Sequence, residues 1–408
     1  MDVKYHRYLL SLLNQESHKK RVRLILGARQ TGKTTLFSLL KDKNDILIDL
    51  QDRSERLRFL QDPSLLTRTV LAIKTPNSNI FIDEIQKVPE LLDEIQFIVD
   101  KNPGKFTFTL TRSSSRRLKS SSSNLLPGRA RIYFISPILL AEQKKYLNNK
   151  HLILPLDKYP DENASLFPDK EIEDMLVFGT LPGLWGNMFK EDLESYVMLY
   201  LEEEIQKEAL VRNISNFSRF LKLAAVESGK FINLSKISQE TGIAVSTIKE
   251  FYKLLEDTFI GFSIFPFAKS NRIRLLKSPK FYFFDVGVRN VVAGLPLDKG
   301  ILSTEGGHLF EHFIASELYW RCKYLGRNYN LYYFRSLSGL EVDFVIETPN
   351  EIIPVEIKYT NNISPNDANK IEKFINLFPP AKRGFVIANI KREEQLSKNV
   401  LAVGWHQI

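Results

Sequence analysis

The sequence predicts an α/β protein in three parts, and three local patterns support this prediction. Near the N-terminus an apolar strand runs into a glycine-containing loop and then a helix. Near residue 242 two short helical patterns are separated by a turn that contains glycine. Near residue 350 two strand patterns meet at a turn and carry acidic and basic side chains. The predicted parts are residues 1–150, 151–300 and 301–408, the last being a second α/β domain.

Length and composition limit the class of protein. The chain has 408 residues, more than an ordinary domain of about 100 to 150, and its apolar and charged contents are those of globular proteins. No run approaches the roughly 20 apolar residues of a membrane-spanning helix, and the N-terminus lacks the pattern of a secretory signal. The single cysteine, Cys322, excludes an internal disulfide. We therefore expect a soluble, cytoplasmic protein with no membrane partner.

The basic residues are concentrated in the first third of the chain. Residues 1–145 hold 26 Lys and Arg against 15 Asp and Glu, whereas the remaining residues hold 31 against 33. The segment 101–145 is the most basic, with ten Lys and Arg and the single acid Glu142. Phosphate or nucleic acid is the natural partner of such a segment, and a solvated basic surface is the alternative.

The first element is the apolar strand VRLIL at residues 22–26, and a loop that fits GxxxxGK[ST] at every fixed position follows it. The two glycines let the backbone amides face the phosphates of a nucleotide at the start of a helix. Lys33 is expected to reach the β- and γ-phosphates, and the Thr34 hydroxyl to ligate Mg²⁺. The motif predicts a P-loop that binds ATP and Mg²⁺ through Gly27, Ala28, Arg29, Gln30, Thr31, Gly32, Lys33, Thr34 and Thr35.

A second strand ends in two acids. Ile80–Ile82 form a short buried-strand pattern, and Asp83 and Glu84 follow it directly. Asp83 is predicted to hold Mg²⁺ through its water shell, and Glu84 to orient or activate the attacking water. The alternative is an ordinary strand end with exposed acids.

Two further candidates come from the next strands. Phe106–Leu110 form a third strand that ends in Thr111, a polar residue at the place where many P-loop ATPases sense the γ-phosphate. A further strand over residues 132–135 follows Arg129, which is a candidate arginine finger acting in cis or in trans. The alternative for Arg129 is a surface cation without a catalytic role.

The middle part predicts a winged helix. An amphipathic helix is expected over residues 194–226, and residues 234–250 have the spacing of a helix-turn-helix with its turn near Gly242. Strands over 259–267 and 281–284 would form the wing, and the basic residues between them are Lys269, Arg272, Arg274, Lys277 and Lys280. This arrangement predicts DNA binding, with a structural or protein-contact module as the alternative.

The last part predicts a nuclease-like carboxylate site. Glu341–Ile346 and Ile353–Lys358 are expected to pair as two strands, so that Asp343, Glu356 and Lys358 follow the order D…ExK. Asp343 and Glu356 would hold Mg²⁺, and Lys358 would orient or deprotonate water. The alternative is a scaffold without cleavage, with an ion pair between Glu356 and Lys358. No His or Cys spacing typical of a zinc site is present.

A family resemblance rests on the order of these segments along the chain: GARQTGKTT, FIDEIQ, TLTRSSSRRL, LPGRARIYFISPILLAEQ, FGTLPGL, KSPKFYFFDVGVRN, GGHLFEHFIASEL, YYFRSLSGLEVDFVIE and PVEIKYT. Their order resembles that of the AAA-superfamily ATPases of bacteria and archaea that carry a C-terminal domain of unknown function with a restriction-nuclease-like pattern. This resemblance covers nearly the whole chain, and it implies Glu311 as an additional carboxylate of the last domain. The chain departs from the family at Arg112, where glycine is usual, and at Glu203 and Glu204, where an Arg-Asp pair is usual.

The expected function is Mg²⁺-dependent ATP hydrolysis coupled to DNA binding. Two alternatives stay open. One is an ATP-regulated DNA nuclease that cleaves at Asp343, Glu356 and Lys358, and the other is a nucleotide-dependent DNA-binding switch that does not cleave. AAA-type relatives commonly form rings, so a homo-oligomer is a further open expectation.

Overall fold

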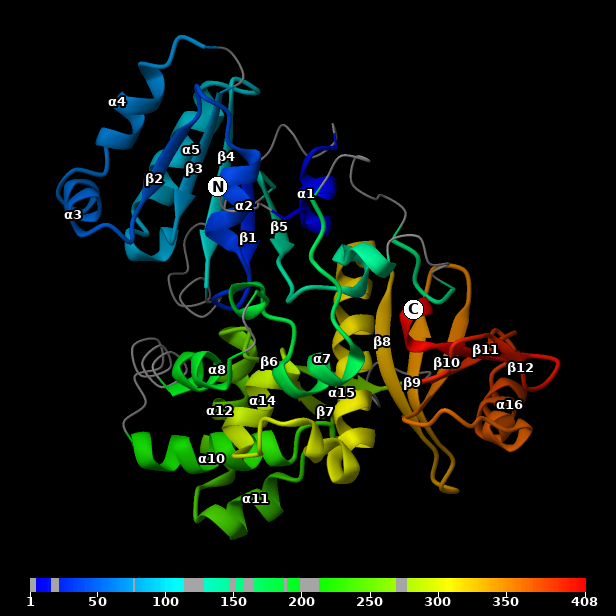
Figure 1. The fold of residues 1–408 in the computed structure, drawn as a ribbon. Helices are drawn as coiled ribbons and strands as arrows, with labels where there is room; N and C mark the ends of the chain where they lie inside the picture. The colour runs from blue at the N-terminus through cyan, green and yellow to red at the C-terminus, as the bar shows by residue number, and fades with distance from the viewer. Residues whose placement is uncertain are drawn as a thin grey trace. The chain divides into compact units, whose positions relative to one another are not determined.

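The structure is a computed structural model that describes residues 5–15, 22–75, 78–113, 128–146, 152–156, 165–186, 189–198, 213–268 and 277–408 (Figure 1). The chain divides into two compact units. Unit 1 holds Met1–Ser136, Lys158–Phe167 and Asp257–Phe259. Unit 2 holds Pro137–Asp157, Pro168–Glu256 and Ile260–Ile408.

Unit 1 is built on a parallel sheet of five strands in the order β2-β3-β4-β1-β5. Because all five strands run the same way, the segments that follow them emerge at one edge of the sheet. Strand β4 lies between β1 and β3, so its end separates the glycine loop from the acid pair. The mixed α/β class with a parallel sheet is thereby confirmed. The strands are β1 Val22–Leu26, β2 Ile46–Asp49, β3 Ser78–Asp83, β4 Phe106–Arg112 and β5 Ala130–Phe134.

Helices cover both faces of this sheet, as the alternation of side chains along β3 shows. Ile80 and Ile82 join the core formed with α4 and α5, whereas the ring of Phe81 lies 5.1 Å from that of Phe37 on α2. Apolar side chains on both faces explain why the strand reads as a continuous apolar run. The helices of unit 1 are α1 Tyr8–Leu13, α2 Lys33–Leu40, α3 Arg53–Gln61, α4 Leu65–Leu71 and α5 Leu91–Lys101.

Unit 2 contains a mixed sheet of eight strands in the order β12-β13-β11-β10-β9-β8-β6-β7. The two strands expected to form a wing, β6 and β7, pair in antiparallel fashion, but β6 also pairs in parallel with β8. They therefore form one edge of the large sheet. Lys269, Arg272 and Arg274 lie outside the described residues. The strands are β6 Gly261–Pro266, β7 Lys280–Phe283, β8 Asn330–Arg335, β9 Glu341–Glu347, β10 Ile352–Lys358, β11 Gly384–Ala388, β12 Glu394–Gln395 and β13 Val400–Gly404.

The helices of unit 2 include the predicted pair around Gly242, which ends α11 with a left-handed φ of 69°. The long helix expected over 194–226 is described only as α8 and α10, and Glu203 and Glu204 lie outside the described residues. Helix α15 contacts β7, β8 and β10, and α16 contacts β9, β10 and β11. The helices are α7 Ile172–Phe178, α8 Lys190–Tyr196, α10 Ile214–Val226, α11 Leu234–Thr241, α12 Val245–Asp257, α14 Val286–Ala293, α15 Leu302–Leu325 and α16 Asn369–Leu377.

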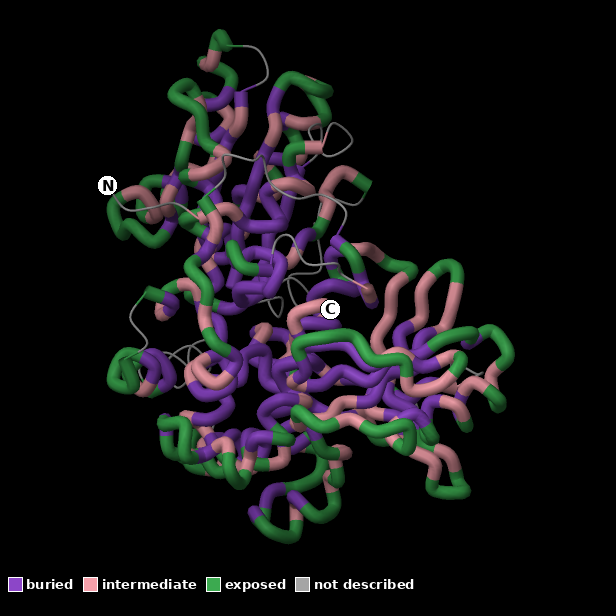
Figure 2. The backbone as a smooth tube through the Cα atoms, turned by 45° about the vertical axis from the view of Figure 1, so that its right-hand side comes forward, coloured by how far each residue is buried: buried purple, intermediate pink, exposed green. Residues whose placement is uncertain are grey.

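Buried residues run through the interior of each unit, and exposed residues lie at the periphery (Figure 2). Strand β1 is buried along its whole length, and so is β11. Within the described part of the chain, no helix is both long and apolar enough to span a bilayer.

Candidate nucleotide site and carboxylate cluster

The loop after β1 has two positions that require glycine. A Cβ added to Gly27 would lie 2.6 Å from Cγ2 of Ile135 and 2.7 Å from its carbonyl oxygen, so the backbones of the two segments approach too closely for any side chain. Gly32 has a φ of 89°, which L-residues rarely adopt. These two glycines give the loop its tight curl directly before α2.

Within the loop, two side chains bind backbone carbonyls. The Lys33 ammonium donates to the carbonyl oxygens of Gly27 at 2.9 Å and Ala28 at 2.8 Å, and Lys33 is only 6% exposed. The Thr31 hydroxyl donates to Ala28 O at 2.7 Å. The lysine thus lies folded across the loop, with its charge held at the N-terminal end of α2.

The Asp83 carboxylate contacts side chains from α2, from β4 and from the segment after β2. Its Oδ2 accepts from the Thr34 hydroxyl at 2.7 Å and from Nε2 of Gln51 at 3.2 Å, and its Oδ1 accepts from the Thr111 hydroxyl. Thr111 also accepts a hydrogen bond from the Glu84 N–H at 3.0 Å. Thr111, on the strand between β1 and β3, thus contacts both acids of the site, the Asp83 carboxylate and the Glu84 backbone.

Glu84 is buried and firmly held. It has a φ of 57°, which is unusual for a residue with a side chain and occurs preferentially at functional sites. The Ser113 hydroxyl lies 2.9 and 2.8 Å from its two carboxylate oxygens, and the Gln86 amide also donates to the carboxylate. The carboxylate therefore has a defined orientation beside Asp83.

The donor set suits a Mg²⁺–nucleotide complex. Thr34 and Asp83 offer two oxygens 2.7 Å apart, and Mg²⁺ usually takes only one or two protein oxygens and completes its shell with water and phosphate. The backbone amides at the start of α2 and the Lys33 ammonium are suited to phosphate. These groups would hold the nucleotide phosphates and the ion.

The other predicted loop residues are more exposed than Lys33. Gln30 has a left-handed φ of 55°, and Arg29 and Thr35 are exposed.

Arg129 precedes β5 and forms a bidentate pair with Asp100, with distances of 2.6 and 3.1 Å. Since Ala130 is paired with Val22 at the start of β1, Arg129 lies at the edge of the sheet opposite to the glycine loop. The structure does not bring it together with the nucleotide-site residues of the same chain.

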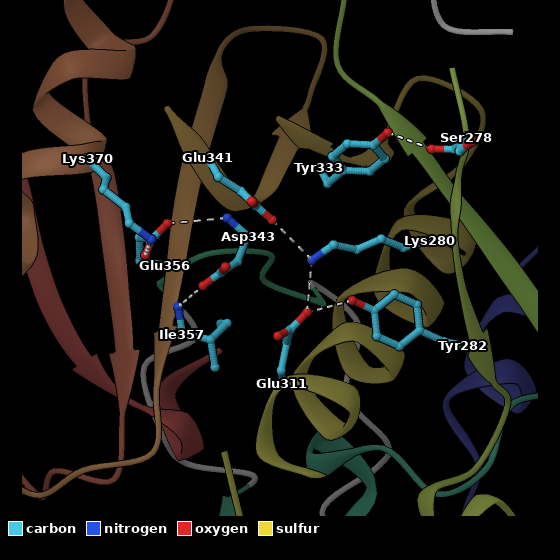
Figure 3. A network of polar contacts seen from close by, with 10 residues as sticks. All are labelled: Ser278, Lys280, Tyr282, Glu311, Tyr333, Glu341, Asp343, Glu356, Ile357 and Lys370. Carbon is cyan, nitrogen blue, oxygen red and sulfur yellow. Dashed lines mark hydrogen bonds and ion pairs between the residues drawn. The ribbon is translucent and has the colours of Figure 1, made fainter. Parts of the chain in front are cut away.

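In unit 2, Asp343 and Glu356 lie on the paired strands β9 and β10 (Figure 3). The Ile357 N–H donates to Oδ2 of Asp343 at 2.8 Å, and the Asp343 N–H donates to Oε1 of Glu356 at 3.3 Å. Each carboxylate thus accepts a hydrogen bond from the backbone of the other strand.

Lys358 is not the partner of Glu356. The ammonium that contacts Glu356 belongs to Lys370 of α16, at 2.9 Å, while Lys358 lies 3.8 Å from Asp367. Both Glu356 and Lys358 face the segment that leads into α16, which agrees with their two-residue spacing along a strand. The ion pair between Glu356 and Lys358 that was one alternative is therefore replaced by two separate pairs.

A second set of contacts surrounds Glu311 of α15. Its Oε1 accepts from the Tyr282 hydroxyl at 2.7 Å and from the Lys280 ammonium at 3.2 Å, and Lys280 lies 3.9 Å from Glu341. Figure 3 shows Lys280 between the two glutamates. Lys280 is 5% exposed, so this buried ammonium is held by carboxylates, as burial of a charge requires.

Burial changes the acidity of the carboxylates. It raises the pKa of Asp343 to about 7, and the negative charges of Glu356 and Glu311 add to this effect. Burial also raises the pKa of Glu356, against the opposing effect of Lys370. Within the described residues, no three His, Cys, Asp or Glu side chains are arranged to hold a metal ion. The carboxylates are held by lysines and backbone amides instead.

Several residues of these sites escape sequence reasoning. Ser113 lies two residues beyond Thr111 on the same strand end, and that spacing was a usable signal. Gln51 and Lys370 are set in place by chain segments remote in the sequence, and no local pattern indicates them.

Three families match consecutive stretches of the chain. Residues 19–174 match a family described as "AAA domain". Residues 169–299 match a "Domain of unknown function (DUF8612)", and residues 306–408 match a "Domain of unknown function (DUF4143)".

Relatives of the chain are similar over most of its length. "Uncharacterized protein Rv2008c" of Mycobacterium tuberculosis is 24% identical over 359 residues, which cover 86% of this chain and 73% of the relative. "Uncharacterized protein MJ1637" of Methanocaldococcus jannaschii is 27% identical over 431 residues, covering 96% of this chain and 85% of the relative. Among solved structures, that of protein VC1899 from Vibrio cholerae covers 94% of both chains at 11% identity, with a TM-score of 0.19, too low to indicate a common fold.

The glycine loop, the acids at the end of β3 and the family match agree with one another. Together they support an AAA-like ATPase domain in residues 19–174, and the C-terminal domain of unknown function is present in residues 306–408.

Proposed function

We propose that this protein binds ATP with Mg²⁺ and hydrolyses it at the end of β1, β3 and β4. The observation that carries the proposal is the contact of Thr34 with Asp83 beside Thr111 and Glu84, which are the residues that such chemistry requires at that spacing. The "AAA domain" match to residues 19–174 supports the same function.

Each side chain has a role in this proposal. Lys33 and the loop amides bind and orient the phosphates, and Thr34 and Asp83 hold Mg²⁺, which neutralises charge on the phosphate oxygens. Glu84, oriented by Ser113, positions a water molecule for attack and accepts its proton. Thr111 contacts both the Asp83 carboxylate and the Glu84 backbone, so it fixes the position of the Mg²⁺ ligand relative to the residue that positions the water.

The test is Mg²⁺-dependent phosphate release from ATP by the purified protein, together with ATP binding. We expect Lys33→Ala to lose binding, and Glu84→Gln to bind ATP while losing turnover, with Lys41→Ala on the exposed end of α2 as the matched control. Failure of the wild type to bind ATP would disprove the proposal.

A second candidate is metal-dependent cleavage of phosphodiesters at Asp343 and Glu356. The supporting observation is that each of the two carboxylates accepts a hydrogen bond from the backbone of the other strand. Glu311 lies near them, and the Lys280 and Lys370 ammonium groups contact Glu311 and Glu356. In this proposal Lys370 and Lys358 are the cations available to phosphate and water.

Cleavage is tested on plasmid and single-stranded DNA with Mg²⁺ or Mn²⁺, with and without ATP. Activity that disappears in both Asp343→Asn and Glu356→Gln, and persists in Glu394→Gln on the exposed strand β12, would support the candidate. Activity that survives in both variants would assign it to a contaminant and reject the site.

DNA binding through α12, the second helix of the pair around Gly242, is the remaining part of the proposed function. Lys249 and Lys253 are exposed on one face of α12, four residues apart, where phosphate contacts would form. The charge reversal Lys249→Glu with Lys253→Glu should weaken DNA binding in fluorescence anisotropy and lower its salt dependence. Lys236→Glu on α11 is the matched control, since Lys236 is paired with Glu240. An unchanged affinity would reject this surface.

Arg129 belongs to a further proposal, that of a homo-oligomer. An arginine finger at this position would act on the nucleotide of a neighbouring copy, after release from Asp100. The measurement is sedimentation of the protein with and without ATP, combined with the turnover of Arg129→Ala. A monomer with unchanged turnover in the variant would reject a trans-acting role.

A further inference from the structure

Arg7 lies against the nucleotide loop, where its side chain contacts Thr31, 24 positions further along the chain. It is the residue before α1 and is 3% exposed. Its Nη1 donates to the carbonyl oxygen of Thr31 at 2.6 Å, and its Nη2 donates to the carbonyl oxygen of Ser136 at 2.6 Å. One planar guanidinium thus joins the loop after β1 to the segment after β5.

The Ser136 carbonyl, the second acceptor of the Arg7 guanidinium, is itself fixed to the sheet. The Ile135 N–H, next to Ser136, donates to Leu26 O at 2.9 Å, directly before the loop. Strands β1 and β5 are paired along their length, so Ser136 O is a stationary acceptor. Since the two donors of the guanidinium are rigidly spaced, the position of the Thr31 carbonyl is set by the position of Ser136.

The Thr31 carbonyl controls the direction of an amide of the loop. A trans peptide unit is planar, so its C=O and the following N–H point in opposite directions. When Arg7 holds the Thr31 carbonyl, the Gly32 N–H must point away from the guanidinium. Gly32, with its φ of 89°, lacks the Cβ that would restrict this peptide, and a Cβ placed there would lie 3.5 Å from Nη1 of Arg7. The arginine supplies the restriction that glycine does not.

We propose that Arg7 is a positioning residue of the nucleotide loop, which turns the Gly32 amide toward the phosphates of bound ATP. This inference rests on the proposed ATP binding at the loop. The arginine acts through the Thr31–Gly32 peptide and does not itself touch the nucleotide. Charge-assisted hydrogen bonds to both carbonyls keep the loop in one conformation before ATP arrives, which lowers the entropic cost of binding.

Contacts of other residues also anchor the N-terminal segment. The Tyr5 and Phe167 rings lie 4.6 Å apart, and the His6 N–H donates to Ser165 O at 2.7 Å. Leu9 and Leu13 of α1 are fully buried. Removal of the guanidinium is therefore expected to free the loop without releasing α1, and this separates a positioning role from a purely structural one.

The experiment measures dissociation constants of Mg²⁺-ATP and Mg²⁺-ADP by calorimetry, together with kcat, KM and the melting temperature. We expect Arg7→Ala to raise the dissociation constants of both nucleotides about tenfold or more, because both have the β-phosphate that the loop cradles. KM should rise more than kcat falls. Arg7→Lys keeps the positive charge and can donate to one carbonyl, so its dissociation constants should lie between those of wild type and Arg7→Ala. Arg7→Lys is also the test variant if Arg7→Ala does not fold.

Chemical rescue gives a readout that a structural role would not produce. Millimolar guanidinium chloride should restore part of the nucleotide affinity of Arg7→Ala. The control is Arg68→Ala, which removes an exposed arginine of unit 1 that is bound to Asp62 and Ser64, and its nucleotide affinity should not change on addition of guanidinium. The inference is overturned if wild type binds ATP and Arg7→Ala binds it within twofold, whatever its melting temperature. If the wild type itself does not bind ATP, the proposed function fails first, and the inference falls with it.

Discussion

Thr34 and Asp83, 49 positions apart in the chain, share a hydrogen bond of 2.7 Å, although β1, which precedes the loop and helix of Thr34, and β3, which ends in Asp83, are not neighbours in the sheet. The bond brings a helix-borne hydroxyl onto the carboxylate of β3, across the end of β4. This oxygen pair is the place where a hard cation would be bound.

Thr34→Ala should raise the Mg²⁺ concentration needed for half-maximal ATP hydrolysis by about tenfold or more, since it removes one of two protein oxygens. The measurement is phosphate release during a Mg²⁺ titration at saturating ATP. Ser38→Ala, also on the exposed side of α2, should leave the titration unchanged because its hydroxyl donates to Thr35 O. Equal titrations for Thr34→Ala and wild type would contradict the assignment.

Thr111→Val should reduce kcat by at least about tenfold with little change in KM, because it leaves an oxygen of Asp83 and the N–H of Glu84 without this partner. Burying these groups unsatisfied should also lower the free energy of unfolding by about 1–3 kcal/mol. Steady-state kinetics and urea titrations measure the two effects. Thr107→Val, four residues earlier on β4 and away from the acids, is the control. A normal kcat in Thr111→Val would remove Thr111 from the site.

Gly306→Ala and Gly307→Ala should change stability in opposite directions. A Cβ at Gly306 would lie 2.5 Å from the Tyr359 ring, whereas a Cβ at Gly307 has no neighbour within 4 Å. Both lie in α15, where alanine is favoured over glycine by about 1 kcal/mol. We therefore expect a higher melting temperature for Gly307→Ala and a lower one for Gly306→Ala. Equal shifts would show that Tyr359 moves aside.

The stability of unit 2 should depend on pH through Asp285. Burial raises the pKa of Asp285 to about 6 although its carboxylate accepts from the Thr180 and Val288 amides. A folded-state pKa above the unfolded value means that the folded protein binds more protons between about pH 4 and 6. Stability from this group is therefore lost as pH rises through that window.

Asp285→Asn keeps the shape and removes the titration. The free energy of unfolding is measured for both proteins by urea titration at pH 4 to 8. As pH rises to about 6, the free energy of unfolding of the wild type should fall relative to that of Asp285→Asn, and the difference should then level off. A difference independent of pH would show that the carboxyl does not titrate in this range.

Much of the first unit follows from local sequence. The strand at Val22–Leu26 has the predicted bounds, and the buried strand before Asp83 and the strand before Thr111 each extend by one or two residues. Parallel strands buried on both faces have a continuous apolar pattern, which is why they are readily predicted. The glycine loop lies between β1 and α2, as its motif requires.

The remaining features depend on contacts between distant segments. Nothing near Phe265 indicates that it pairs with Tyr332, so the attachment of β6 to the large sheet escaped prediction. The D…ExK spacing placed Glu356 and Lys358 on one side of a strand, but it did not show that Lys370 takes the place of Lys358 beside Glu356. Helix α15 begins at Leu302, and Gly306 and Gly307 in its first turns weaken the helical pattern of the sequence there.

Unit 1 is discontinuous along the chain, and this limits how it can be obtained alone. Phe259, separated by more than 120 residues from the end of β5, packs on the same apolar core as β1, β3 and β4, with its ring 6.0 Å from that of Phe134. A fragment that stops at Ser136 would lack this aromatic ring and also Phe167, the partner of Tyr5. The domain that bears the nucleotide loop is therefore completed only when most of the chain has been synthesised, so a single cut in a gene cannot isolate it.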